Sequence, residues 1–282
     1  MKVLVTGADG QLGREIRDLA LSEEMTFTDV AQLDLTNFSA VSSLFEEKGF
    51  DLVINCAAYT AVDRAETNEE LATKVNNEAV ANLARLCLEH DTRLIHISTD
   101  YVFDGNQPTP YKEEDATNPQ SVYGKTKLAG ENAILETGCE AMILRTAWLY
   151  SSFGANIAKT ILKFADSKQE ISFVYDQIGT PTYAADLAQV IGLLVQNPQK
   201  FRSGIYHYTN EGVASWYDFA AAIVSLSKSG CHVHPIETFE YPVPAPRPTN
   251  SLLNKRKIKD ALSITIPHWR DSLAKCLEKL NS

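Results

Sequence analysis

Tyr123 and Lys127 are the two residues whose types and spacing best suit proton and hydride chemistry. They stand four positions apart, so in a helix they share one face, whereas Lys125 points elsewhere and is assigned to solvent. A free tyrosine hydroxyl has a pKa of about 10, and a neighbouring ammonium favours the phenolate and lowers that pKa. Tyr123 could then give a proton to a carbonyl oxygen while a reduced cofactor gives hydride to the carbonyl carbon.

Thr99 supplies a second hydroxyl for the same carbonyl oxygen. It lies about 24 residues before Tyr123, at the end of the apolar run 93–98, where a parallel strand would present it. We expect Thr99 to donate a hydrogen bond that fixes the position of the reacting oxygen. A lone Tyr-x-x-x-Lys spacing is common by chance, and the strand end before it makes a chance match improbable.

A glycine-rich loop near the start of the chain predicts a dinucleotide site. Gly7, Gly10 and Gly13 follow the β-branched run 2–6 and precede residues with helical spacing. Gly7 permits the tight turn, Gly10 lets the backbone approach a pyrophosphate, and Gly13 lets the helix pack closely on the strand. The free N–H groups at the helix start would face the phosphates.

Further residues are placed to line the rest of the cofactor site. Asp29 stands 22 residues after the first glycine, where an acidic residue holds the adenosine ribose and would favour NADH by repelling a 2′-phosphate. Asp34 and Leu35 begin the next crossover and should line the adenine pocket. Ala57 and Ala58 end a buried strand, and their small side chains let the cofactor lie across the strand ends.

The hydrophobic pattern predicts an α/β fold with a Rossmann-type, doubly wound parallel sheet and a smaller C-terminal α/β substrate lobe. Strands are expected at 2–6, 25–30, 51–57, 93–98 and 141–148, with a sixth at 171–175. Helices are expected around 12–19, 38–45, 71–83, 122–135, 187–195, 216–223 and 269–280, the sixth of these capped by Ser215. Residues 1–150 should form the cofactor domain, rejoined by about 170–200, and the remaining segments of 151–282 the lobe. Four prolines in 241–248 predict a loop there.

Composition excludes several classes of protein. The 282 residues carry a formal net charge of −10, which disfavours nucleic-acid binding because phosphate contact needs clustered positive charge. No apolar stretch is long enough for a transmembrane helix, and we expect neither a signal peptide nor a membrane partner. Five widely spaced cysteines form no metal-type pair, as is usual for reduced thiols of a cytoplasmic protein.

Four segments resemble the extended short-chain dehydrogenases/reductases and, within them, the dTDP-4-dehydrorhamnose reductase family. The resemblance covers nearly the whole chain and is most specific in Ser-Thr-Asp-Tyr-Val-Phe-Asp-Gly. The segments are 56–66, 98–105, 144–150 and 176–182. This resemblance implies an enzyme that uses NADPH or NADH to reduce the C4 keto group of a dTDP-4-dehydro-6-deoxy sugar. That reaction is the last step in making dTDP-L-rhamnose for cell-surface polysaccharide.

The resemblance also implies roles for individual residues. The catalytic set would be Thr99, Tyr123 and Lys127, with Lys127 also bonding the nicotinamide ribose. The residues implied at the cofactor are Gly7, Gly10, Gln11, Leu12, Gly13, Asp29, Asp34, Leu35, Ala57, Ala58, Thr60, Ser98, Tyr123 and Lys127. Those implied at the substrate are Thr99, Asp100, Tyr101, Trp148, Asn156, Gln177 and Arg247. Trp148 would stack on or wall the sugar, and the Arg247 guanidinium would clasp the diphosphate. Asn76 would brace the sheet or a proton-relay water.

Some members of the family dimerise through a magnesium site made of glutamates. Glu15 is present here, but the region after Thr182 offers only Asp186, so we expect no metal, and both a monomer and a homodimer remain open. Two other functions also remain open. One is another nucleotide-sugar reductase or epimerase of the same superfamily, and the other is a non-catalytic, cofactor-binding regulatory subunit.

Overall fold

A parallel sheet forms the centre of the computed structural model, which describes residues 1–281. Its order is β10-β5-β4-β3-β1-β2, with every neighbouring pair parallel. The strands are β1 (Lys2–Thr6), β2 (Glu24–Thr28), β3 (Leu52–Asn55), β4 (Arg93–Thr99), β5 (Ala141–Thr146) and β10 (Gly204–His207). The order reverses direction at β1, which opens a crevice beyond the carboxyl ends of β1 and β3.

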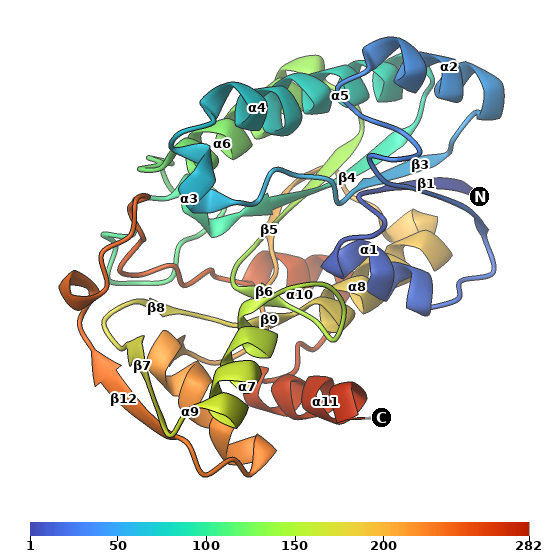
Figure 1. The fold of residues 1–282 in the computed structure, drawn as a ribbon. Helices are drawn as coiled ribbons and strands as arrows, with labels where there is room; N and C mark the ends of the chain where they lie inside the picture. Colours follow the sequence, from blue (N-terminus) through green and yellow to red (C-terminus); the bar gives the residue numbers. More distant parts are fainter. Residues whose placement is uncertain (282) are drawn as a thin grey trace.

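Helices cover both faces of the sheet (Figure 1). One layer contains α2 (Phe38–Lys48), α4 (Glu69–Thr73), α5 (Ala79–Glu89) and α6 (Val122–Thr137). The other contains α1 (Gln11–Asp18), α8 (Ala184–Gln196) and α10 (Arg256–Leu262). Because helices cover both faces of the sheet, strands such as β3 and β5 are buried at every residue. This confirms the predicted doubly wound α/β fold.

A second core lies below the sheet and belongs to the C-terminal lobe (Figure 1). Its helices are α7 (Ile157–Ser167), α9 (Trp216–Ser227) and α11 (Trp269–Asn281). Its short strands are β6 (Leu149–Tyr150), β7 (Glu170–Val174), β8 (Ile178–Gly179), β9 (Thr182–Tyr183), β11 (Ala214–Ser215) and β12 (His232–Ile236). Ser215 caps α9 as predicted, in a reciprocal pair of hydrogen bonds with Asp218.

The predicted sixth strand of the main sheet is wrong. Residues 171–175 fall largely in β7, which pairs with β12 in a separate two-stranded sheet. The sixth position is taken by β10, which pairs with β5 and packs Tyr206 into the sheet core. The short run in β10 lies between a turn and an irregular segment, so its periodicity was too brief to mark it as a strand.

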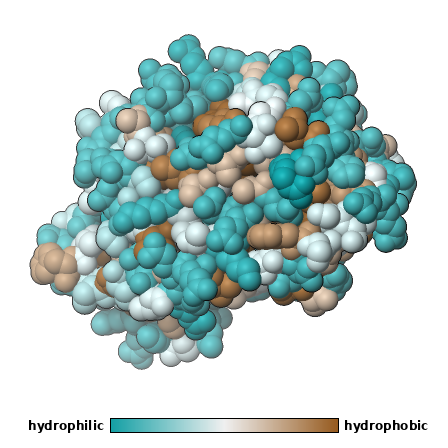
Figure 2. Space-filling view, turned by 90° about the horizontal axis from the view of Figure 1, so that it is seen from above, coloured by the Kyte–Doolittle hydropathy of each residue, from teal (hydrophilic) through white to brown (hydrophobic). Residues whose placement is uncertain are grey.

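Four short helices complete the connections between residues 1 and 281. They are α3 (Val62–Ala65) and the 3-10 turns η2 (Asp100–Val102), η3 (Pro198–Lys200) and η4 (Thr238–Glu240). The helix expected at 71–83 is interrupted by the π-helical segment η1 (Lys74–Glu78), between α4 and α5. The outer face of this helical layer is mostly hydrophilic with small apolar patches (Figure 2). Within residues 1–281, no helix is both long and apolar enough to span a membrane.

Candidate active site

The glycine loop lies over the reversal point of the sheet. Gly7 has a φ of 64°, and a Cβ there would stand 2.6 Å from the backbone nitrogen of Ala57 at the end of β3. A Cβ on Gly13 would stand 2.5 Å from the Gly7 carbonyl oxygen. Both positions therefore require glycine, as predicted. The amides of Gln11, Leu12 and Gly13 begin α1 ahead of its first intrahelical bond, from Arg14 to Gly10, and are suited to bind phosphate.

Asp29 follows β2 directly, where an acidic residue was predicted. Its carboxylate accepts hydrogen bonds from the amides of Asp9, at 2.9 Å, and Val30, at 2.8 Å. It therefore ties the glycine loop to the end of β2 as well as standing where a ribose would lie. Asp34 accepts from both the amide and the hydroxyl of Thr36, which lowers the pKa of its carboxyl. Leu35 is mostly buried in the core under α2, and its predicted contact with adenine stays a prediction.

Asn76 braces the loop after β3 against α6. Its amide group bonds both the N–H and the carbonyl of Tyr59, and it donates to the Thr126 hydroxyl at 3.1 Å. A Cβ on Gly130 would stand 2.2 Å from the Asn76 carbonyl oxygen, so α6 packs directly on the π-helical turn. This contact fixes Ala58 and Thr60, which lie in the braced loop, relative to the helix that carries Tyr123.

Tyr123 lies in the first turn of α6, whose N-terminus is capped by Ser121. Burial raises the pKa of Tyr123 to about 12, and a hydrogen bond with the Thr99 hydroxyl opposes part of that rise. Thr99 also donates to Asp100 at 3.0 Å and accepts from the amide of Tyr101. The two predicted hydroxyls, from β4 and α6, are thus brought together.

Lys127 contacts buried groups of β4, and its predicted effect on the pKa of Tyr123 stays a prediction. Its ammonium nitrogen lies 2.7 Å from the carbonyl oxygen of Ile97 and 3.2 Å from Nε2 of His96. Burial lowers the pKa of Lys127 to about 8, partly offset by Glu131. The prediction considered only the helix face and did not include these buried groups of β4, which also contact the lysine.

Ser98 is also used differently from expectation. Its hydroxyl donates to the carboxylate of Glu131, which forms a fully buried ion pair with Arg145 at 2.6 Å. Ser98 lies on the α6 face of β4, whereas Thr99 lies on the opposite face, because successive strand residues alternate. The Ser98 side chain is therefore part of the support beneath the site, and its predicted contact with a cofactor stays a prediction.

Asp100 and Tyr101 follow β4 and lie next to Thr99 and Tyr123. Burial raises the pKa of Asp100 to about 6, with opposing hydrogen bonds that include Thr99. The rings of Tyr101 and Tyr123 meet edge to face, with centres 5.6 Å apart. A Cβ on Gly124 would stand 2.3 Å from the Tyr101 carbonyl oxygen, so close packing of α6 holds this pair in place.

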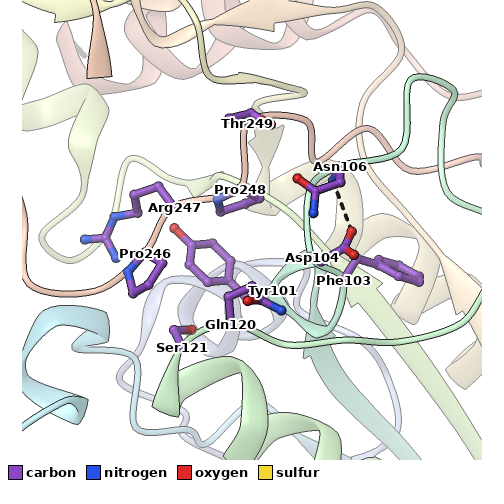
Figure 3. Close-up of a pocket in the computed structure, with 10 residues that line it drawn as sticks. All are labelled: Tyr101, Phe103, Asp104, Asn106, Gln120, Ser121, Pro246, Arg247, Pro248 and Thr249. Carbon is purple, nitrogen blue, oxygen red and sulfur yellow. Dashed lines mark hydrogen bonds between the residues drawn. The ribbon is translucent and has the colours of Figure 1, made fainter. Parts of the chain in front are cut away.

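A cavity of about 210 Å³ lies between Tyr101 and the proline-rich segment (Figure 3). Its lining residues are Tyr101, Phe103, Asp104, Asn106, Gln120, Ser121, Pro246, Arg247, Pro248 and Thr249. The Tyr101 hydroxyl points towards Arg247 and Pro248. Arg247 donates to Asp63 at 2.7 Å, and its other terminal nitrogen is buried without a partner among residues 1–281. The predicted basic residue is therefore held in position with a donor still available.

Three other predicted substrate residues contact protein groups. Trp148 stacks on Trp216 with ring centres 3.6 Å apart, and its φ of 49° is strained for a bulky residue. Asn156 is the N-cap of α7 and its amide group bonds three backbone atoms, and its predicted substrate contact stays a prediction. Gln177 donates to Thr238 at 3.1 Å and is not among the residues that line the cavity. Helix capping accounts for the presence of asparagine at position 156. The spacing of residues in the sequence cannot distinguish a capping asparagine from one that binds a ligand.

Glu15 is buried inside the molecule. It accepts hydrogen bonds from the hydroxyls of Ser151 and Ser152, and Lys279 of α11 bonds its other oxygen at 3.0 Å. Asp186 bonds Asn210 and Ser272 instead. No cluster of three or more metal-ligating side chains is present in the chain up to residue 281.

Sequence reasoning missed the groups that support the catalytic residues. The most central are Asp63, which holds Arg247, and His96, which contacts Lys127. Asp63 lies inside one of the resembling segments, but nothing in its spacing assigns it a partner. A histidine between the apolar residues Leu94, Ile95 and Ile97 was the available signal for His96.

The crevice beyond the carboxyl ends of β1 and β3 has the features that a nicotinamide dinucleotide needs. The glycine positions leave a cradle that any Cβ would fill, and the side-chain oxygen of Gln11 is buried there without a partner among the described residues. A Rossmann sheet with this cradle, and with tyrosine and lysine on the helix beside it, defines an oxidoreductase of the short-chain dehydrogenase/reductase class. The sequence model of the RmlD substrate binding domain matches residues 1–282, and the chain belongs to this family.

Known proteins similar over the full length agree with this assignment. The dTDP-4-dehydrorhamnose reductase of Aggregatibacter actinomycetemcomitans is 39% identical over 287 residues, covering 96% of this chain and 97% of the relative. A crystal structure of a dTDP-4-dehydrorhamnose reductase from Clostridium acetobutylicum is 42% identical, with a TM-score of 0.96 and full coverage of both chains. The Bacillus anthracis dTDP-4-dehydrorhamnose reductase, solved in complex with NADP, is 36% identical with a TM-score of 0.94, covering 99% of this chain and all of that one.

Proposed function

We propose that this protein reduces the C4 keto group of dTDP-4-dehydro-L-rhamnose to give dTDP-L-rhamnose, with NADPH or NADH as the reductant. The observation that carries the proposal is the pair of hydroxyls of Thr99 and Tyr123, brought together between the glycine loop and the cavity at Arg247. The relatives named dTDP-4-dehydrorhamnose reductase support the substrate, and the NADP complex of one of them supports the cofactor.

The chain's own residues would hold the cofactor at the reversal point of the sheet. The N–H groups of Gln11, Leu12 and Gly13 would bind the pyrophosphate, and Asp29 would bind the adenosine ribose. Lys127 would bond the nicotinamide ribose. When bound, the nicotinamide supplies hydride to the carbonyl carbon of the substrate.

Thr99 and Tyr123 would hold the carbonyl oxygen, and Tyr123 would give it a proton. A tyrosine whose pKa is raised to about 12 keeps its proton at neutral pH and can donate it as negative charge develops on that oxygen. The buried surroundings exclude water, which strengthens these hydrogen bonds at the moment of transfer.

The substrate's diphosphate would bind at Arg247. The partnerless buried nitrogen of its guanidinium is suited to a phosphate oxygen, while Asp63 fixes the other side of the group. The cavity of about 210 Å³ is smaller than the roughly 300 Å³ or more of complete small-molecule sites, so it would hold only part of a nucleotide sugar. Trp148 and Trp216 would form a further wall beside the sugar.

The test is oxidation of NADPH and of NADH by the purified protein in the presence of dTDP-4-dehydro-L-rhamnose. Keto-sugar-dependent oxidation with dTDP-L-rhamnose as product is the expected result. Tightly bound NAD with no net consumption would indicate an epimerase, and cofactor binding without turnover would indicate a regulatory subunit. If Asp29 sets the preference for NADH, Asp29→Ala should shift the ratio of activities towards NADPH, and an unchanged ratio would reject that role.

We also propose a cytoplasmic location. All five cysteines are free thiols, as is usual in a reducing compartment. A monomer and a homodimer both remain compatible with the proposed chemistry, because every residue assigned above comes from one chain.

A further inference from the structure

A row of buried polar side chains crosses the centre of the sheet and ends at Lys127. Thr6, Asn55 and His96 are register neighbours on β1, β3 and β4. The Thr6 hydroxyl donates to Asn55 Oδ1 at 2.8 Å, and Asn55 Nδ2 lies 3.0 Å from His96 Nδ1. His96 Nε2 lies 3.2 Å from Lys127 Nζ. His96 is completely buried, and the proposed chemistry above assigns no role to it.

The direction of every hydrogen bond in this row can be derived from one backbone amide. The N–H of Ala57 can only donate, and it lies 3.1 Å from Asn55 Oδ1. The other end of the Asn55 amide is therefore the NH₂ group, which donates to Nδ1 of His96. A neutral imidazole that accepts at Nδ1 carries its proton on Nε2. His96 therefore presents an N–H group to Lys127.

Two donors cannot share a hydrogen bond, so this arrangement fits a Lys127 that is a neutral amine. Its lone pair accepts from His96 Nε2–H, and one of its own N–H groups donates to the Ile97 carbonyl oxygen at 2.7 Å. We propose that His96 favours the neutral amine of Lys127 in the free protein, so that at alkaline pH cofactor binding is coupled to uptake of one proton at Lys127. This inference rests on the proposed function in that it needs Lys127 to bind the cofactor ribose as an ammonium.

The proton balance is simple. Lys127 Nζ gives up the hydrogen bond from His96, takes one proton from solvent, and then donates to the ribose hydroxyls, while His96 keeps its own proton. The charged and titratable groups around Lys127 are His96 on β4, Cys56 after β3 and Glu131 on α6. Tyr123 stands four residues earlier on the same helix. Glu131 favours the ammonium, but it is already neutralised by Arg145. Burial lowers the pKa of Lys127 to about 8, so the neutral amine is its main form only above that pH, and burial holds the pKa of His96 well below its usual range, so its ring is neutral there.

The first measurement is on the free protein and needs neither cofactor nor substrate. Two-bond ¹H–¹⁵N NMR spectra of the histidine rings at about pH 9, with His96 assigned from its loss in His96→Gln, should show Nε2 protonated and Nδ1 not. A His96 ring protonated on Nδ1 would overturn the inference, because its Nε2 would then accept from an ammonium.

The second measurement is the number of protons taken up when NADPH binds, from calorimetry in buffers with different ionisation enthalpies. A Lys127 pKa of about 8 in the free protein, returning to about 10.4 in the complex, gives an uptake of roughly 0.9 proton at pH 9 and roughly 0.1 at pH 7. His96→Gln offers an amide oxygen that accepts from an ammonium, so its uptake at pH 9 should fall to less than half. His207→Gln is the matched control, a buried histidine on β10 that does not contact Lys127, and should leave the uptake unchanged.

These results separate the inference from the proposed function. If His96→Gln merely disturbs packing, stability falls while proton uptake at pH 9 stays equal to that of the parent, and the inference is wrong. If the protein binds neither NADPH nor NADH, the proposed function fails, and the ring spectrum of the free protein still decides the state of His96. Normal turnover without proton uptake at pH 9 would reject the inference about Lys127 and leave the proposed function intact.

Discussion

At the scale of single residues, the hydroxyl of Tyr123 is the group on which the proposed reaction depends most. It is buried, hydrogen-bonded to Thr99, and protonated at neutral pH. Removing a general acid costs roughly 10²- to 10⁴-fold in rate. We therefore expect Tyr123→Phe to lower kcat by at least about 100-fold and to leave the Kd for NADPH within about threefold. Tyr175→Phe, at an exposed tyrosine of the lobe, is the control and should retain full activity; equal rates for both variants would exclude Tyr123 as the acid.

Asp100 should make folding stability depend on pH. Its folded pKa of about 6 is raised above the ordinary value of 3.8, so the folded protein keeps a proton that the unfolded chain loses. The stabilising contribution is present at low pH and disappears as the pH rises through the folded pKa. Asp100→Asn stays neutral throughout. Between about pH 4.5 and pH 7, its unfolding free energy should therefore rise by about 2 kcal/mol relative to the parent protein.

Urea titrations of both proteins at the two pH values test this dependence directly. The quantity to compare is the difference in unfolding free energy between Asp100→Asn and the parent at each pH. The contributions of all other titrating groups cancel in this difference, because both proteins share them. A constant stability difference at the two pH values would show that Asp100 titrates normally in the folded state.

Arg247 should affect substrate binding more than the chemical step. Its guanidinium bonds Asp63 and keeps one buried nitrogen for a ligand, a geometry that a single ammonium cannot reproduce. We expect Arg247→Lys to raise KM for the dTDP-sugar by about tenfold, or about 1.4 kcal/mol, with kcat changed less than threefold. Arg256→Lys, at an exposed arginine of α10, provides the comparison in steady-state assays. An unchanged KM for Arg247→Lys would place the diphosphate elsewhere.

At the scale of elements, the contact between α6 and η1 positions the catalytic helix. A Cβ on Gly130 would overlap the Asn76 carbonyl oxygen at 2.2 Å. Gly→Ala inside a helix normally gains up to about 1 kcal/mol, but overpacking against backbone costs about 1–3 kcal/mol and should win here. We expect Gly130→Ala to lower the unfolding free energy by about 2 kcal/mol. Gly230→Ala, where a Cβ meets nothing within 4 Å, should change it by less than about 0.5 kcal/mol in the same urea titration.

The sequence predicted the elements whose pattern is local and repeated. The glycine loop, the strand that ends at Thr99 and the first turn of α6 each carry their own periodicity, and all three occur where expected. The position of β10 could not be predicted, because four residues in a strand have no distinctive pattern until a neighbouring strand is known. The π-helical turn at η1 likewise depends on the packing of Gly130 against Asn76, a contact between residues 54 positions apart.

The site was predictable in its residue types and less so in their contacts. The Thr99 and Tyr123 hydroxyls lie together, and Arg247 lines a cavity, while their roles stay predictions. Lys127 and Ser98 also contact buried partners on other elements that the motifs do not reveal, namely His96 and Glu131. Such contacts depend on three-dimensional proximity, which spacing along one helix or strand does not encode.

At the scale of the whole molecule, a buried contact joins the last helix to the first. Lys279 on α11 bonds Glu15, which is 2% exposed, and Asp18 at the end of α1. Removing the lysine leaves a buried carboxylate without its ammonium, which costs more than loss of a surface pair. We expect Lys279→Met to destabilise the protein by about 1–2 kcal/mol. Lys275→Met, on the exposed side of the same helix, should be nearly neutral in thermal unfolding, and equal effects of the two changes would argue against the contact.

The stacked pair of Trp148 and Trp216 gives the molecule a built-in optical probe. The chain has three tryptophans, and the third, Trp269, lies in the same lobe. Intrinsic fluorescence therefore reports on the lobe and not on the glycine loop. Because reduced nicotinamide absorbs in the range where tryptophan emits, energy transfer should occur from the lobe to a bound cofactor. The efficiency of this energy transfer would report, in real time and without an attached dye, any change in distance between the C-terminal lobe and the cofactor-binding sheet.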